Sequence, residues 1–100
     1  MKITRWTAEI PANKDIIVKL FDKEGLESKP FHIKSGAKFT NQRTHLNEII
    51  QIVQGELIFN LSGTQFVLRQ GDKLEIPANT SYSFSNMKEE ESVFISAQKV

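Results

Sequence analysis

The feature that most constrains this chain is the regular alternation of short apolar runs with turn residues. Each run is bounded by Gly, Asp, Asn, Ser or Pro, which is the pattern of β-strands joined by tight turns. Turn signals recur about every 8–12 residues, which is typical of a sandwich or barrel and not of a βαβ fold. The expected strands are at residues 16–21, 31–34, 49–53, 57–61, 66–68, 74–76, 81–85 and 93–95.

Alternation within these runs predicts which side chains face the interior. Leu57, Phe59 and Leu61 fall on one side of their strand because successive side chains point to opposite faces. Tyr82 and Phe84 share a face in the same way, with serines on the other. The sequence therefore predicts an all-β barrel with an apolar interior.

Length and composition narrow the classes of protein. One hundred residues predict one domain over residues 1–100, with a core thin enough to benefit from oligomerisation. Thirteen basic and twelve acidic side chains give a net charge of +1, which provides no electrostatic basis for binding nucleic acid or an anionic membrane. There is no cysteine, so a disulfide framework and a thiolate metal site are excluded. With no signal peptide and no membrane-spanning run in the sequence, we expect a cytoplasmic protein.

Two glycine-led motifs run through the second half of the chain. In the first, gaps of five, one, three and six residues separate Gly36, Gln42, Thr44, Glu48 and Gly55. In the second, gaps of five, one, two and three residues separate Gly71, Pro77, Asn79, Tyr82 and Asn86. Every gap agrees with the two motifs of the cupin family, G-x5-H-x-H-x3-E-x6-G and G-x5-P-x-G-x2-H-x3-N. The chain therefore resembles a cupin, most closely over residues 31–86.

The resemblance implies a double-stranded β-helix, the jelly-roll barrel of the cupins, with its core motifs at residues 36–55 and 71–86. It also implies pairing of barrels, so we expect a homodimer to which Trp6, Ile16 and Val18 contribute. The motif glycine replaced by Asn79 need not disrupt the turn, because asparagine tolerates a left-handed backbone.

The metal positions of the motifs are mostly replaced. In a metal-binding cupin, three histidines and a glutamate would converge on one divalent ion; here those positions hold Gln42, Thr44, Tyr82 and Glu48. An amide and a hydroxyl are weak ligands, and a phenol with a pKa near ~10 must lose its proton to bind a metal well. We therefore expect no metal and no other cofactor.

The two histidines of the chain are the remaining candidates for metal ligands. His45 lies one residue out of register with the motif, and a one-residue slip turns a side chain to the other face of a strand. A bulge could re-aim it, so the alternative is one divalent transition metal held by His45 and Glu48. Otherwise His45 lies on the rim or outside. His32 stands between Phe31 and Ile33 and is expected at a surface or interface.

Three functions follow from this reading. The first is binding of a small polar molecule, a sugar or small acid, in a pocket formed by Gln42, Thr44, Glu48, Tyr82 and Phe84. The second is a cupin enzyme, either an isomerase or epimerase or a metal-dependent oxygenase or lyase, with Glu48, Tyr82 and His45 as catalytic candidates. The third is a structural or interaction barrel without a pocket.

Overall fold

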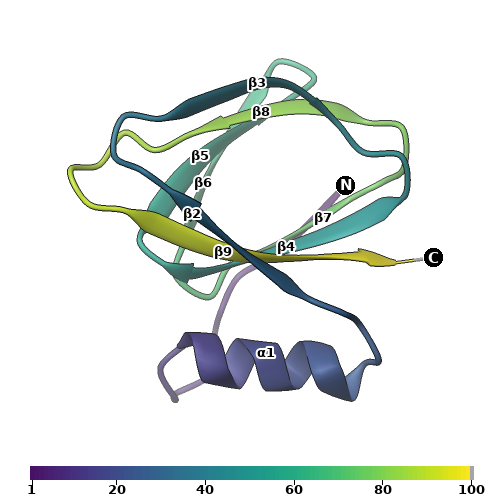
Figure 1. The fold of residues 1–100 in the computed structure, drawn as a ribbon, viewed down its shortest axis with the longest axis vertical. Coiled ribbons are helices and arrows are strands. Elements are labelled where there is room, and N and C mark those ends of the chain that lie inside the picture. The colour runs from purple at the N-terminus through teal and green to yellow at the C-terminus, as the bar shows by residue number, and fades with distance from the viewer. Residues whose placement is uncertain (100) are drawn as a thin grey trace.

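The computed structural model describes residues 1–99, which form two antiparallel sheets and one helix. The five-stranded sheet has the order β1 (Lys2–Thr4), β7 (Lys73–Ile76), β4 (Asn47–Gln54), β9 (Ser92–Lys99) and β2 (Lys29–Ile33). The four-stranded sheet has the order β3 (Lys38–Arg43), β8 (Ser81–Ser85), β5 (Glu56–Leu61) and β6 (Thr64–Arg69). The sheets face each other, as Figure 1 shows, and the predicted mostly-β, jelly-roll architecture is confirmed.

The space between the sheets is filled by an apolar core. Leu57, Phe59 and Leu61 point into it from β5 and are almost completely buried. Ile50 and Ile52 enter the same core from β4. The faces predicted from alternation for residues 57–61 and 81–85 are therefore confirmed. Removing this much apolar surface from water is the main favourable contribution to folding.

One predicted strand is wrong: residues 16–21 belong to helix α1 (Lys14–Lys23). Asn13 begins the helix, because its side-chain oxygen accepts a hydrogen bond from the Ile16 backbone N–H at 3.0 Å. Ile17 and Phe21, four residues apart, lie on one helix face and are buried. A short β-branched run fits a strand or a helix equally well, and here the cap and the four-residue spacing decide.

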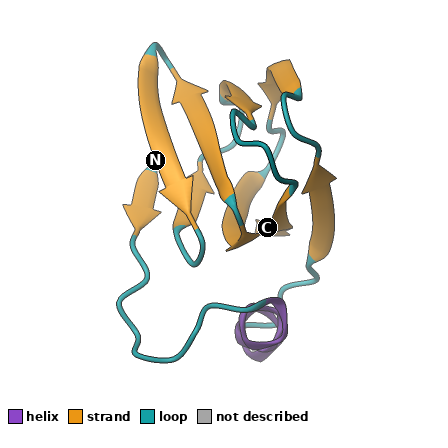
Figure 2. Cartoon of the chain, turned by 90° about the vertical axis from the view of Figure 1, so that its left-hand side faces the viewer, coloured by secondary structure: helices purple, strands orange, loops and turns teal. Residues whose placement is uncertain are grey.

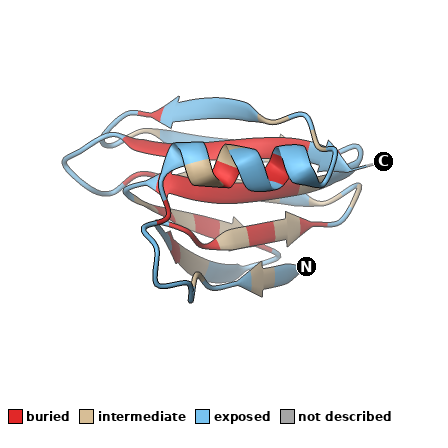
Figure 3. Cartoon of the chain, turned by 90° about the horizontal axis from the view of Figure 1, so that it is seen from below, coloured by how far each residue is buried: buried red, intermediate tan, exposed pale blue. Residues whose placement is uncertain are grey.

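Helix α1 covers the outer face of the five-stranded sheet. Its buried residues pack against Ile49, Val53 and Ile95 in a second apolar cluster, separate from the barrel core. Figure 2 shows the helix outside the sheets, and Figure 3 shows it in front of strands coloured as buried. No helix within residues 1–99 is long and apolar enough to cross a membrane.

Residues 5–13, the N-terminal strap, connect β1 to α1 around the turn that precedes β7. An Arg5–Asp72 ion pair of 2.6 Å anchors its start. Gln70 holds its end by donating to the Ala12 carbonyl at 2.7 Å. Trp6 sits directly on Gly71, where an added Cβ would lie 2.5 Å from the Trp6 Cβ. Glycine at position 71 is therefore required both for this contact and for a φ of +93°.

The residues suggested for a dimer interface are largely used within the chain. Trp6 and Val18 pack against the cluster between α1 and the sheet. Ile16, at the start of α1, is only partly buried. Homodimerisation itself stays a prediction. Trp6 and Val18 are packed within the chain and are therefore not free apolar surface for a dimer interface.

Candidate functional site

Glu48 is the centre of the candidate site, at the end of the barrel where β4 begins. It lies on the inward face of β4, in line with Ile50 and Ile52. The Ser96 hydroxyl donates a 2.6 Å hydrogen bond to Glu48 Oε1. No basic side chain in residues 1–99 forms an ion pair with Glu48. The carboxylate is thus only partly satisfied by the protein and can accept further hydrogen bonds.

Tyr82 faces Glu48 from the opposite sheet. Burial, reinforced by the negative charge of Glu48, raises the pKa of the Tyr82 phenol from 10.0 to about 12. The phenol therefore keeps its proton at neutral pH and acts as a hydrogen-bond donor. Its ring is fixed by stacking on Phe59 and Phe84, with centroids 6.2 and 6.1 Å away.

A β-bulge in β3 sets the direction of Gln42. Between the pairs Phe39–Phe84 and Gln42–Tyr82, two residues of β3 oppose one of β8, and Asn41 adopts a φ of +56°. Gln42 is consequently directly opposite Tyr82. Its amide nitrogen donates to the Thr40 carbonyl at 3.0 Å, which holds the side chain close to its own strand.

Thr44 connects the end of β3 to the loop between β7 and β8. Its hydroxyl donates to the Pro77 carbonyl at 2.9 Å and accepts from the Thr80 backbone N–H at 3.2 Å. Its backbone carbonyl accepts from the Asn79 N–H at 2.8 Å, and Asn79 has a φ of +61°. The expectation that Asn79 preserves this turn in a left-handed conformation is confirmed. Both hydrogen bonds of the Thr44 hydroxyl are made to the loop before β8. Thr44 therefore stabilises this loop, and its hydroxyl is not free to bind a ligand.

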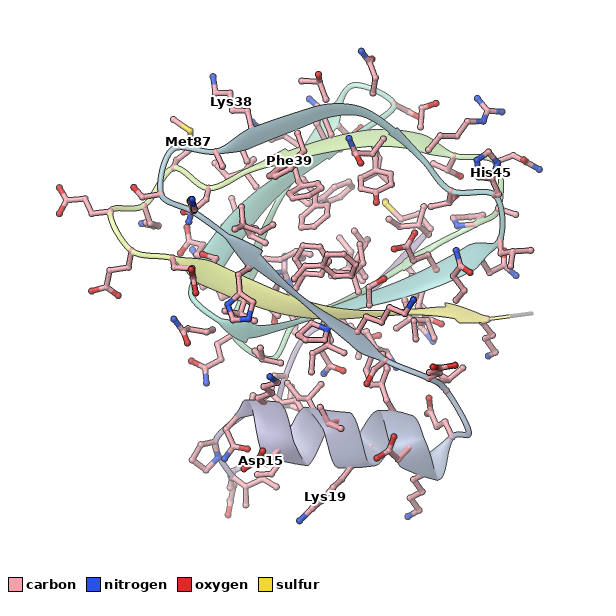
Figure 4. The ribbon with its side chains drawn as sticks, in the orientation of Figure 1. Asp15, Lys19, Lys38, Phe39, His45 and Met87 are labelled. Atoms are coloured by element: carbon pink, nitrogen blue, oxygen red, sulfur yellow. The ribbon has the colours of Figure 1, made fainter. Side chains whose placement is uncertain are left out.

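Phe84 is part of the filled centre of the barrel. It is 8% exposed and stacks on Phe39 with centroids 4.9 Å apart. Figure 4 shows the Phe39 ring directed into the barrel. The middle of the barrel is therefore packed with aromatic rings, and space for a ligand lies towards the Glu48 end.

A cavity of ≈380 Å³ opens beside Glu48. Sequence reasoning missed most of its walls, which come from β2, β9 and the segment before β2: Glu27, Lys29, Phe31, Ser96, Ala97 and Gln98. Phe31 is 44% exposed and stacks on Phe94 with centroids 5.2 Å apart, so it presents one ring face to the opening. The alternation of Phe94, Ser96 and Gln98 along β9 could have revealed the polar wall, but the predicted strand stopped at residue 95.

The two histidines lie away from this cavity. His45 is exposed in the loop between β3 and β4, and Figure 4 shows it at the outer end of the barrel. The bulge lies at Thr40 and Asn41 and does not turn His45 inward. His32 is exposed as expected, with its Nδ1 2.9 Å from a carboxylate oxygen of Glu91.

The residues present do not fit a divalent metal centre. The Thr44 hydroxyl is engaged by the loop, Tyr82 retains its proton, and His45 is outside, so Glu48 alone offers a strong ligand. No group of three or more His, Cys, Asp or Glu side chains placed to hold a metal occurs within residues 1–99. Hydrogen bonding and proton exchange are the chemistry that these side chains can support.

Sequence comparison identifies the family. The family described as "Cupin domain" matches residues 31–97, which is more than half of the chain. The chain therefore belongs to the cupin family, and the resemblance noted from the two motifs is confirmed. No curated protein sequence matches the chain significantly.

Solved structures agree on the fold. A cupin superfamily protein from Desulfitobacterium hafniense matches with a TM-score of 0.67 and 11% identity, over 99% of this chain and 76% of that one. Drosophila melanogaster CENP-C, in a structure bound to CAL1, matches with a TM-score of 0.67 and 22% identity, over 72% and 63%. The DMSP lyase DddQ from Ruegeria pomeroyi matches with a TM-score of 0.65 and 17% identity, over 74% and 38%. This chain thus spans less than two thirds of the CENP-C and lyase chains, and these identities establish the fold alone.

Proposed function

We propose that this cupin domain binds a small sugar-like molecule at the Glu48 end of its barrel, without a metal. The observation that carries the proposal is the Glu48 carboxylate at the wall of a ≈380 Å³ cavity, where within residues 1–99 it forms no ion pair and is hydrogen-bonded only to Ser96. That volume lies within the range of about 300–1,000 Å³ in which small-molecule sites fall.

The polar groups around the cavity suit a neutral ligand rich in hydroxyl groups. Glu48 accepts hydrogen bonds, while Lys29 and Gln98 on the rim supply donors. Phe31 adds a flat apolar surface on which one face of a sugar ring could rest. A small acid fits less well, because the cavity wall carries two carboxylates, Glu48 and Glu27, against the single ammonium group of Lys29.

Calorimetric titration with a panel of monosaccharides, disaccharides and small carboxylic acids tests this proposal, using protein treated with a chelator. We expect a sugar to bind and Glu48→Gln to weaken it at least about tenfold, because hydrogen bonds to a charged group contribute ~1.5–3 kcal/mol. Glu89→Gln, which removes a carboxylate from the exposed loop between β8 and β9, is the matched control and should leave the affinity unchanged. Binding that survives Glu48→Gln, or binding of acids in place of sugars, would contradict the proposal.

The Glu48–Tyr82 pair also supports a second candidate, a proton-transfer enzyme. Glu48 would take a proton from the ligand and Tyr82, whose pKa of about 12 keeps it protonated, would donate one. Tyr82→Phe distinguishes the two candidates. A binding domain should keep most of its affinity in this variant, whereas an enzyme should bind its substrate and lose turnover.

A further inference from the structure

A second cavity lies outside the barrel and plays no part in the site around Glu48. It has a volume of ≈220 Å³, opens to solvent, and lies between the N-terminal strap, helix α1 and the outer face of the five-stranded sheet. The residues that define its chemistry are Trp6, Leu20, Phe21, Glu24, Gln51 and Lys73.

Gln51 provides a polar group on the sheet side of this cavity. It is 6% exposed, and its amide nitrogen donates to the Gly71 carbonyl at 3.0 Å. That bond is the only one its side chain makes within residues 1–99, so the amide oxygen Oε1 has no partner there. No fully buried side-chain oxygen or nitrogen in the same residues lacks a partner. Oε1 must therefore reach the solvent of the cavity that Gln51 lines, where it can accept a hydrogen bond.

Three charged side chains line the cavity with Gln51, and one of them, Arg5, is already paired with Asp72. The other two are Lys73 and Glu24. Lys73 is the direct neighbour of Gln51 across the β4–β7 ladder, so the two side chains lie next to each other on the outer face. Glu24 stands at the other side, at the end of α1. Neither Lys73 nor Glu24 forms an ion pair with any described residue. A positive and a negative group thus line one small cavity without being paired to protein charges.

The remaining walls are apolar and firmly held. Phe21 is 3% exposed, and Leu20 is exposed at the edge. Trp6 is fixed from two sides: its indole N–H donates to the Ile10 carbonyl at 3.0 Å, and its Cβ packs on Gly71. Apolar walls with a few convergent polar groups are the usual form of a ligand site.

We propose that this cavity binds a small apolar α-amino acid. Lys73 would pair with the ligand carboxylate, and Gln51 Oε1 with Glu24 would accept hydrogen bonds from its ammonium group. The apolar side chain of the ligand would contact Trp6, Leu20 and Phe21. At ≈220 Å³ this cavity is smaller than the one beside Glu48, so its ligand must be small.

Tryptophan fluorescence gives a direct test, because Trp6 is the only tryptophan in the chain and lines this cavity. We expect L-leucine and L-phenylalanine to change the Trp6 emission in a saturable way. 3-Phenylpropionate, which lacks the ammonium group, and phenethylamine, which lacks the carboxylate, should bind at least about tenfold more weakly, since each loses a charge-assisted hydrogen bond.

Variants locate the site. Lys73→Gln should weaken amino-acid binding about tenfold or more, and Leu20→Phe should reduce it by filling the cavity without adding a tryptophan. Lys19→Gln is the matched control for charge, because Lys19 points away from the sheets in Figure 4, and it should leave binding unchanged. Circular dichroism should show the same fold for all three variants.

The proposal is overturned if millimolar amino acid leaves the Trp6 emission unchanged, which would make the cavity a packing gap only. Binding that is the same in Lys73→Gln as in the unaltered chain would overturn it equally. The test is independent of sugar binding, because Trp6 and Glu48 lie on opposite faces of the five-stranded sheet.

Discussion

The two faces of the five-stranded sheet are covered in different ways. The inner face packs against the second sheet, and its core includes Ile50, Ile52 and Phe94. The outer face packs against a single helix, through Ile49, Val53 and Ile95. Both faces of β4 and β9 are therefore buried, which explains why residues 49–53 are apolar at every position except Gln51 and do not alternate with polar residues.

Each face also contains one polar residue of β4 beside a cavity. On the inner face Glu48 is charged and hydrogen-bonded to Ser96. On the outer face Gln51 is neutral and bonded to the Gly71 carbonyl. The comparison indicates that one strand supplies both candidate ligand sites, one inside the barrel and one under the helix.

The largest expected effect of a single substitution is at the centre of the barrel. Phe59→Ala should lower the free energy of unfolding by ~3–5 kcal/mol, because Phe59 is completely buried and contacts three other aromatic rings. Urea denaturation followed by circular dichroism measures this loss. A loss below about 1 kcal/mol would mean that the aromatic core is not the main stabilising element.

A smaller loss is expected beneath the helix. Ile17→Ala should cost about 2–3 kcal/mol, at the low end of the range for such truncations, because a helix on the surface can settle onto the sheet and shrink the cavity left behind. Lys19→Ala is the control and should change stability by no more than about 0.5 kcal/mol. An Ile17→Ala loss equal to that of Phe59→Ala would contradict the difference between the two faces.

The smallest expected effect is the pH dependence that Tyr82 contributes. Its pKa is 10.0 in the unfolded chain and about 12 when folded, so its stabilising contribution is full below pH 10 and is lost as the pH rises towards about 12. For a fully buried group, this increase in pKa would correspond to ~2.7 kcal/mol of the free energy of unfolding. Because the Tyr82 phenol is partly exposed, solvent screening reduces the contribution to about 1 kcal/mol.

Tyr82 is the only tyrosine, so an ultraviolet absorbance titration measures its pKa directly. Glu48→Gln should lower this pKa but leave it above 10, because burial is the larger cause of the shift. A midpoint near 10 in the unaltered chain would show that Tyr82 is solvated and does not face Glu48 inside the barrel.

Local patterns in the sequence predicted most of the barrel. Alternation predicted the inward faces of β5 and β8, and motif spacing singled out Glu48 and Tyr82, which the structure brings together. Helix α1 was missed because its β-branched run satisfied the strand pattern, and its cap at Asn13 is a single residue.

Local sequence patterns did not predict the walls of the cavity beside Glu48. Lys29 and Phe31 reach Glu48 from a strand that is distant in sequence, and the two strands do not pair directly. Such proximity depends on how the sheets pack and leaves no local signal. The bulge at Thr40 and Asn41 likewise determines where Gln42 points, although the sequence suggested a bulge only for His45.

The most direct test of the account is an amide chemical-shift titration of chelator-treated protein with the best-binding sugar. We expect saturable shifts around Glu48, Ser96 and Phe31, with a titration midpoint at least about tenfold higher in Glu48→Gln, and no shifts in the amides of α1. Shifts that appear only after a divalent metal is added, or that map away from the Glu48 end of the barrel, would contradict metal-free binding at this site.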